Sequence, residues 1–203
     1  MGKPVKRQDG IYGMEDSPRG RLLSEAAKLF RDKGYERTTV RDIAAAVGIQ
    51  SGSIFHHFPS KEAILYAVIE EVIRTNTARL RLAIQGEADA SVKLRALIHQ
   101  ELVFIVGDTR EAMSVMVQEW RCLSPQQQQQ ALSLRQLYED IWLEVLGELH
   151  AAGRFRATPF VMRRLITGMN SWAHNWFDPD RDLSLEDLAV IILERVLGEG
   201  SAA

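Results

Sequence analysis

Cysteine is almost absent from this chain of 203 residues. Cys122 stands alone, so no disulfide can form within the chain, and a reducing compartment is expected. No apolar run reaches the roughly 18 residues that a membrane span needs. The polar stretch 1–16 lacks the apolar centre of a signal peptide, and we expect it to be a disordered tail. These features predict a soluble, cytoplasmic protein.

Strand patterns and common catalytic motifs are also lacking. No convincing alternation of apolar and polar residues favours a strand. The chain has no G-x-S-x-G elbow, no phosphate-binding glycine loop and no H-E-x-x-H pair, which argues against an enzyme. Asp178, Asp180 and Asp182 begin like a calcium loop, but Leu183 stands at its glycine position and Ala189 at its final glutamate. We expect no catalytic residue, no metal and no cofactor.

The charge that is present is unevenly distributed. The formal net charge is −2, yet residues 1–61 carry 11 Lys and Arg against 7 Asp and Glu, a net +4, and the remainder carries −6. A basic head on an acidic body favours a polyanionic partner at one end, although chance asymmetry remains an alternative. Hydrophobic residues make up 46% of the chain, enough for a packed core.

Helical periodicity and capping residues recur along the chain. Ser17 followed by Pro18 is typical of a helix start, and Gly34 of a left-handed helix end. Further starts are indicated at Thr39 with Asp42, Ser60, Asp89 or Ser91, Asp108 with Glu111, Ser124, Thr158 and Ser184. The sequence predicts an all-α fold of about nine helices. A three-helix head at 17–61 precedes a helical-bundle body at 62–198, and 199–203 forms a second tail.

The most informative stretch runs from Thr39 to Leu65. It contains a short helix, a tight turn centred on Gly48, where a positive φ is needed, and a second short helix over 51–57. This is the shape of a helix-turn-helix. In such a motif the N-terminal residues of the second helix meet base edges in the major groove. Gly52 would let the backbone come close to a partner.

The stretch resembles the DNA-binding head of the tetracycline-repressor (TetR) family over about residues 19–66. The matching residues are Thr39, Ile43, Ala44, Gly48, Gly52, Ile54, His57, Phe58, Ser60, Lys61, Glu62 and Leu65. Gln50 stands where Ser or Thr is usual, which weakens the expected N-cap, and Phe55 stands where Tyr is usual. The resemblance implies a ligand-responsive regulator, in most members a repressor, that is released from palindromic operator DNA by a small molecule.

Together the motif and the resemblance predict the residues that contact DNA. They are Thr39, Val40, Arg41, Gln50, Ser51, Gly52, Ser53, Phe55, His56, His57 and Lys61. Gln50 can read adenine, and the N–H groups at Val40 and Lys61 can meet phosphates. His56 and His57 point about 100° apart on a helix, which is poor geometry for a shared metal.

The body is expected to hold a ligand site and a dimer contact. Apolar walls with a few polar groups suggest a pocket formed from Phe104, Met113, Met116, Trp120, Arg121, Trp142, Met169, Asn170 and His174. Each of these alone also fits a core or surface role. The resemblance implies a homodimer through the last two helices, 159–177 and 185–197. The alternative is that their apolar faces form an intramolecular core.

Some body motifs are similar to those of regulators that sense acyl-CoA thioesters. They are Glu119-Trp120-Arg121, Asn170-x-Trp172 and Trp176-Phe177-Asp178-Pro179. The effector would then be an acyl-CoA or another apolar metabolite, with Arg121, Arg163 and Arg164 as donors to its phosphates. A helical adaptor that binds only protein is a further alternative, but it would need neither the motif nor the basic head.

Overall fold

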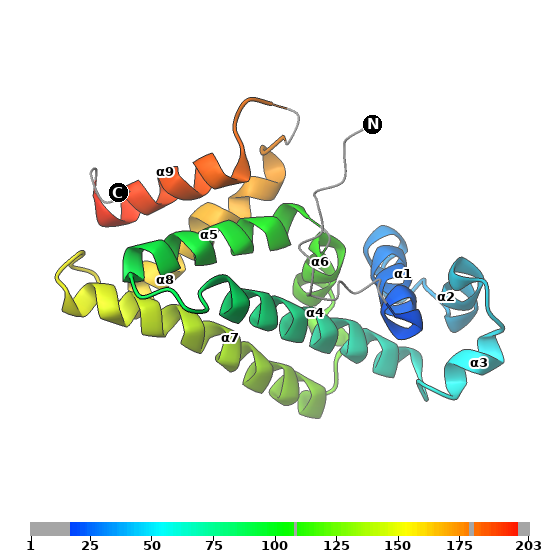
Figure 1. Ribbon diagram of the computed structural model, residues 1–203. Helices are drawn as coiled ribbons and strands as arrows, with labels where there is room; N and C mark the ends of the chain where they lie inside the picture. Colours follow the sequence, from blue (N-terminus) through cyan, green and yellow to red (C-terminus); the bar gives the residue numbers. More distant parts are fainter. Residues whose placement is uncertain (1–16, 108, 179–180, 199–203) are drawn as a thin grey trace. The chain divides into compact units, whose positions relative to one another are not determined.

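The computed structural model describes residues 17–107, 109–178 and 181–198. Within these ranges all regular structure is helical, with nine α-helices, two 3₁₀ turns and no strand, so the expected all-α fold is confirmed (Figure 1). The predictions for the two tails, and those that involve Asp108 or Asp180, lie outside the described residues. No helix in the described part is long and apolar enough to cross a membrane.

Side-chain caps define most helix starts. Ser17 Oγ accepts the N–H of Gly20 at the start of α1 (Pro18–Lys33), and Thr39 and Asp42 form a capping box at α2 (Val40–Val47). Asp89 rather than Ser91 caps α5. The remaining elements are α3 (Ser51–Phe55), α4 (Lys61–Ala83), α5 (Ala90–Val106), α6 (Arg110–Gln118), η1 (Trp120–Cys122), α7 (Pro125–Ala151), α8 (Pro159–Trp172), η2 (Ala173–Asn175) and α9 (Leu185–Leu197).

Three helix ends differ from the sequence expectation. Gly34 has a positive φ of 82° but an extended ψ of 151°, so it ends α1 without the left-handed conformation. The helix expected over 159–177 stops at Trp172 and tightens into η2, because 3₁₀ turns close many helix ends. The helix expected over 51–57 ends at Phe55.

The chain divides into two compact units, which we call the head unit and the body unit. Of the described residues, the head unit contains 17–76 and 109–136, and the body unit contains 77–107, 137–178 and 181–198. The head unit therefore includes α6, η1 and the beginnings of α4 and α7, besides α1 to α3. The expected domain boundary at residue 61 lies inside it, and it stays a prediction about where the DNA-binding part ends.

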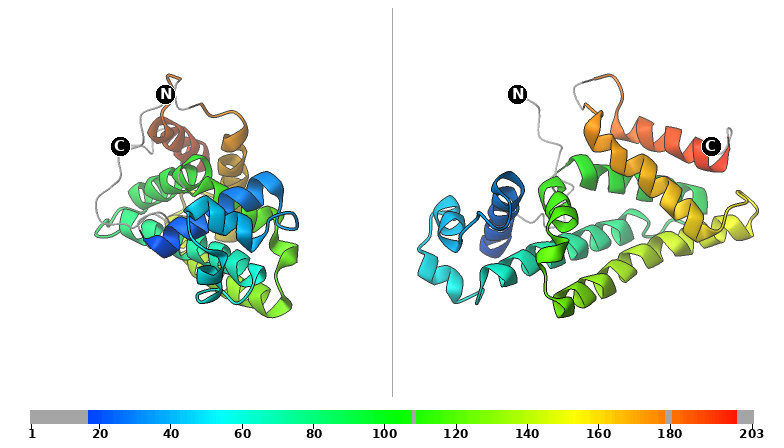
Figure 2. Two further views of the ribbon diagram at one scale, coloured as in Figure 1. Left: turned by 90° about the vertical axis from the view of Figure 1, so that its right-hand side faces the viewer. Right: turned by 180° about the vertical axis from the view of Figure 1, so that it is seen from behind.

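Each unit has its own apolar core. The head core is built around fully buried Leu23, Phe30, Ile43, Ile54 and Ile64. The body core includes Leu97, Ile98, Trp142, Ile166 and Leu193, where α5 packs against α8 and α9 (Figure 2). Burying one such side chain contributes roughly 1.5–3 kcal/mol, so these cores fix the helices that carry the sites described next.

Candidate nucleic-acid interface and polar core

The turn at Gly48 sets the geometry between α2 and α3. Gly48 has φ 73° and ψ 29°, the left-handed conformation that a Cβ disfavours. Its N–H bonds to the carbonyls of Ala44 and Ala45. Ile43 on α2 and Ile54 on α3 are fully buried in the core that the two helices share. The helix-turn-helix expected from the sequence is therefore present.

Most residues expected to contact DNA lie exposed around this turn. Thr39, Arg41, Gln50, Gly52, Ser53, Phe55, His56 and His57 are exposed, whereas Val40, Ser51 and Lys61 are partly buried. Gln50 makes no capping bond to α3, in keeping with its weak capping ability. Phe55 keeps 54% of its surface exposed. Within the head unit, the N-terminal part of α3 is thus accessible to a binding partner.

Lys61 has a role that the motif did not suggest. Its Nζ donates to the carbonyl oxygens of Tyr35 and Glu36 at 2.9 and 3.2 Å and lies 4.2 Å from the centre of the Tyr35 ring. Glu119 Oε1 accepts the N–H of Tyr35 at 3.1 Å. Burial, with smaller effects from nearby acidic groups, raises the pKa of Tyr35 to about 12. The connection between α1 and α2 is therefore held from two sides, by α4 and by the end of α6.

A second contact ties α6 to α1. Arg31 donates to Glu111 Oε1 at 2.6 Å, and the two helices pack closely. The Glu111 carboxylate is half-buried, and its hydrogen bonds from Arg110 and Arg31 outweigh desolvation and lower its pKa. Such a charge-assisted hydrogen bond is stronger than a neutral one. This ion pair therefore joins α6 to α1, the helix that precedes the helix-turn-helix.

The candidate ligand residues are divided between the two units. Met113, Met116 and Trp120 are partly buried and Arg121 is exposed in the head unit. In the body unit, Phe104, Trp142 and Asn170 are buried, and Met169 and His174 are exposed. Neither unit by itself brings the whole set together. A ligand role for these residues stays a prediction.

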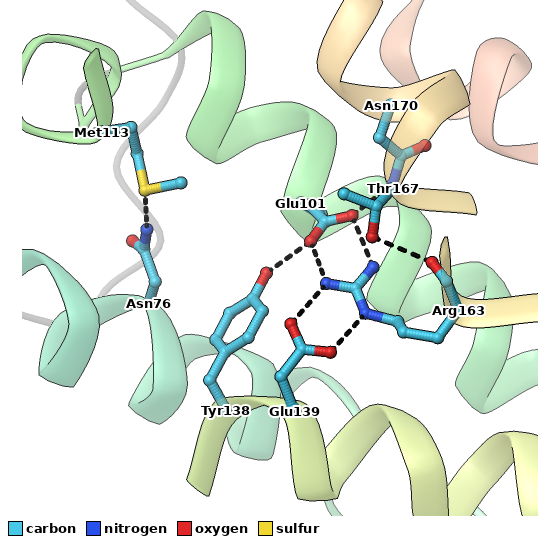
Figure 3. A network of polar contacts seen from close by, with 8 residues as sticks. All are labelled: Asn76, Glu101, Met113, Tyr138, Glu139, Arg163, Thr167 and Asn170. Atoms are coloured by element: carbon cyan, nitrogen blue, oxygen red, sulfur yellow. Dashed lines mark hydrogen bonds and ion pairs between the residues drawn. The ribbon is translucent and has the colours of Figure 1, made fainter. Parts of the chain in front are cut away.

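A polar cluster lies in the body core, and the sequence reasoning missed most of it. Arg163 of α8 donates to both oxygens of Glu101 of α5 at 3.1 and 2.7 Å, and its Nε donates to Glu139 at 3.1 Å (Figure 3). Tyr138 Oη and Asn170 Nδ2 also donate to Glu101, at 2.8 and 2.7 Å. The guanidinium of Arg163 lies 4.0 Å from the centre of the Trp142 ring. The cluster joins α5, α7 and α8.

The buried charges of Glu101 and Arg163 compensate each other. Desolvation alone would raise the pKa of Glu101, but the positive charge of Arg163 and the hydrogen bonds from Arg163, Asn170 and Tyr138 hold that pKa below its ordinary value. Burial and the nearby carboxylate raise the pKa of Tyr138 well above its ordinary value. Arg163 already donates hydrogen bonds to the carboxylates of both Glu101 and Glu139. It is therefore a poor donor for a ligand phosphate, contrary to the role suggested from the sequence.

Helical spacing contains a signal for these buried groups. Glu101 lies seven residues after Leu94 and four after Leu97, on the buried face of α5. Arg163 and Asn170 flank Ile166 on one face of α8 in the same way. A charged residue within an apolar stripe therefore indicates a buried partner, but not which one.

The exposed face of α8 is apolar. Phe160, Val161, Leu165, Met169 and Trp172 of α8, and Trp176 just after η2, expose between 37% and 65% of their surface. The alternative that they form an intramolecular core does not hold for these side chains. It does hold for most of α9, whose Leu188, Ile192, Leu193 and Val196 are buried in the body core. Large apolar patches of this kind mark interaction surfaces.

Comparison with known families covers both parts of the chain. Residues 22–68 match the family described as "Bacterial regulatory proteins, tetR family", and residues 87–198 match "Tetracyclin repressor-like, C-terminal domain". The HTH-type transcriptional repressor KstR2 of Mycolicibacterium smegmatis is 33% identical over 186 residues, which is 90% of this chain and 90% of that protein.

Solved structures are similar over the same range. The superantigen PfiT is 52% identical, with a TM-score of 0.79 over 91% of this chain and 98% of its own. The TetR family transcriptional regulator PfmR of Thermus thermophilus is 31% identical, with a TM-score of 0.76 over 87% of this chain and 97% of its own. These likenesses extend over the helix-turn-helix and the body alike.

Proposed function

The chain belongs to the TetR family of bacterial regulatory proteins, and from that premise we propose that it represses transcription as a homodimer that a small molecule releases from operator DNA. Each subunit would place α3 in a major groove of a palindromic site. The family membership indicates a transcriptional regulator rather than an enzyme. Repression is supported by the KstR2 relatives, which are HTH-type transcriptional repressors.

One observation carries the DNA-binding proposal. α3 follows a left-handed glycine turn, its buried side is anchored by Ile54, and its N-terminal residues are exposed. A short helix held in this way can enter a major groove of about 12 Å width. Gln50, Ser51 and Ser53 offer the donors and acceptors that read base edges. Arg41, exposed on α2, would contact phosphate.

The dimer proposal rests on the exposed face of α8. Its five large apolar side chains would be costly to leave in water, and Trp176 after η2 and Ile191 of α9 are also 49% and 42% exposed. A second copy offers the same surface, and a two-fold contact pairs it with itself. The dimer would place two recognition helices on one side of the DNA, which suits a palindromic operator.

For the effector, we propose an apolar metabolite, with acyl-CoA thioesters as the first class to test. The motifs at 119–121 in the head unit and at 170–172 in the body unit are similar to those of acyl-CoA sensors. Because Arg163 is occupied by two carboxylates, CoA phosphates would have to be held by exposed Arg121 or Arg164 instead. A thermal-shift series of acyl-CoAs tests this class, and no shift with any of them would discard it.

The DNA-binding proposal is tested by selection from a pool of random duplexes. After several rounds of binding to the full chain, a palindromic motif should be enriched, and it should compete better than its scrambled form in a gel shift. Enrichment of no motif would contradict the repressor and favour the protein-binding adaptor. Addition of the effector should then release the selected DNA, since coupling between the two sites is reciprocal.

A further inference from the structure

Asn76 of α4 occupies a position where the helix pattern calls for an apolar residue. Ile69, Val72 and Ile73 are buried in the head core and precede Asn76 by seven, four and three residues, on the same face of α4. Asn76 itself is only 2% exposed. A leucine here would complete the stripe without any polar group to satisfy. The asparagine therefore carries a desolvation cost that the core does not need.

The hydrogen bonds of Asn76 do not offset this cost. Its Nδ2 donates to Met113 Sδ of α6 at 3.3 Å, and a thioether is a weak acceptor (Figure 3). Its Oδ1 is buried and has no hydrogen-bond partner. Buried polar atoms are nearly always paired, so an unpaired oxygen needs an explanation. Leaving such a group unsatisfied lowers stability, and stability lost in this way is typical of functional positions.

Met113, whose sulfur accepts from Asn76, can adapt to a ligand. Met116 of α6 and Trp120 of η1 follow it at intervals of three and four residues, and all three are partly buried against the head core. Methionine is unbranched and polarisable, and it makes favourable contacts with aromatic rings. Neither Asn76 nor Met113 is charged. The surroundings therefore favour a neutral molecule that is mostly apolar.

We propose that Asn76 Oδ1 accepts a hydrogen bond from an O–H or N–H group of the effector, and that Met113 moves aside to admit its apolar part. This inference rests on the proposed function and adds the chemical class of the polar group that is recognised. It also gives that ligand a direct effect on the motif. Lys61 of α4 and Glu119 at the end of α6 both hydrogen-bond to Tyr35 in the α1–α2 connection. A molecule between Asn76 of α4 and Met113 of α6 would therefore act on both helices that hold this connection in place.

The test uses two probes, 4-propylphenol and its methyl ether 4-propylanisole, which keeps the ring and the propyl chain but has no donor, titrated calorimetrically into the full chain without DNA. The wild type should bind the phenol about five- to tenfold more tightly, because only the phenol can donate a hydrogen bond. In Asn76→Leu the preference should fall below twofold while the anisole still binds. Thr75→Val, which removes a neighbouring buried hydroxyl of α4, is the matched control and should keep the preference.

The melting temperature of the ligand-free protein separates recognition from a structural role. Asn76→Leu should melt at the same temperature as the wild type or higher, because it removes an unsatisfied oxygen. Equal binding of both probes to the wild type, binding of neither, or a lower melting temperature in Asn76→Leu would overturn the proposal. Failure of DNA selection would overturn the repressor function and leave the probe preference standing, so the two failures are distinguishable.

Discussion

Arg163 donates to both carboxylate oxygens of Glu101, at 3.1 and 2.7 Å, across 62 residues of sequence. The two side chains are 2% and 7% exposed, and together they join α8 to α5 in the body core. A buried pair of this kind has paid for its desolvation with good geometry and additional hydrogen bonds. Removal of Arg163 leaves the buried Glu101 carboxylate with hydrogen bonds from Tyr138 and Asn170 but without a counter-charge.

Replacing Arg163 with methionine should lower the free energy of unfolding by about 3–5 kcal/mol, because the Glu101 carboxylate stays buried without its counter-charge. Urea denaturation measures the change. Arg164→Met is the matched control, since Arg164 is exposed on the same helix, and it should change stability by about 0.5 kcal/mol or less. If both variants lowered the free energy of unfolding equally, loss of the contact with Glu101 would not be the reason for the destabilisation.

Glu101 also makes stability depend on pH. Its pKa in the folded state lies below the ordinary value of 4.5, so the unfolded chain binds the proton more readily. The stabilisation is present above that ordinary pKa and is lost as the pH falls through the folded-state pKa. Melting temperatures of wild type and Glu101→Gln should therefore differ most near neutral pH and converge in acid. A constant difference over the whole pH range would contradict this.

Two glycines of the helix-turn-helix should respond oppositely to alanine. Gly48→Ala should destabilise the protein by about 1–2 kcal/mol, because φ 73° is unfavourable for a residue with a Cβ. Gly52→Ala should stabilise it by up to about 1 kcal/mol, since Gly52 lies within α3 and a Cβ there meets no atom of the chain within 4 Å.

Gly52→Ala should lower the affinity for DNA without lowering the stability of the protein. If the backbone of α3 approaches DNA at Gly52, the added methyl group should weaken binding of the selected duplex in a gel shift, although the free protein is more stable. Unchanged affinity would place Gly52 away from the DNA.

Leu165→Glu should convert the dimer into a monomer, because it places a charge in the apolar face of α8. Sedimentation measures the mass. Leu132→Glu on α7 is the control, since Leu132 is 47% exposed and Leu165 is 55% exposed, but Leu132 lies outside that face. A monomeric wild type, or a dimer that persists in Leu165→Glu, would remove the proposed interface.

Gln50→Ala should change which operator bases are preferred, since Gln50 is exposed beside α3 and makes no cap. Selection from random duplexes with the variant should show reduced preference at one position of each half-site. A uniform loss of affinity for every duplex would mean that Gln50 does not read a base.

Sequence signals were reliable where the interaction is local. The caps at Ser17, Thr39 and Ser184 and the turn at Gly48 each depend on residues within four positions, so spacing alone identifies them. The prediction that α8 extends to residue 177 was wrong, because no comparable stop signal in the sequence marks the change from α8 to η2.

Contacts between residues that are far apart in the sequence could not be predicted from spacing. Periodicity places Glu101 and Asn76 on buried faces, but the choice of Arg163 for one and Met113 for the other depends on how the helices pack. Exposure of Leu165 and Trp172 was likewise undecided, because an apolar helix face fits a core and an interface equally well. The comparisons settle the family, whereas contact with DNA, with an effector and with a second copy stays a prediction.

The contacts that Lys61 makes within the head unit affect how strongly its affinity for DNA would depend on ionic strength. The ammonium of Lys61 is shared by two carbonyl groups and an aromatic ring, so it is less available to neutralise a DNA phosphate than a free lysine would be. The electrostatic part of DNA affinity then falls to other cations such as Arg41, and fewer phosphates are neutralised than the number of basic residues in the head suggests. Most of the selectivity for an operator would have to come from groove contacts that added salt leaves intact.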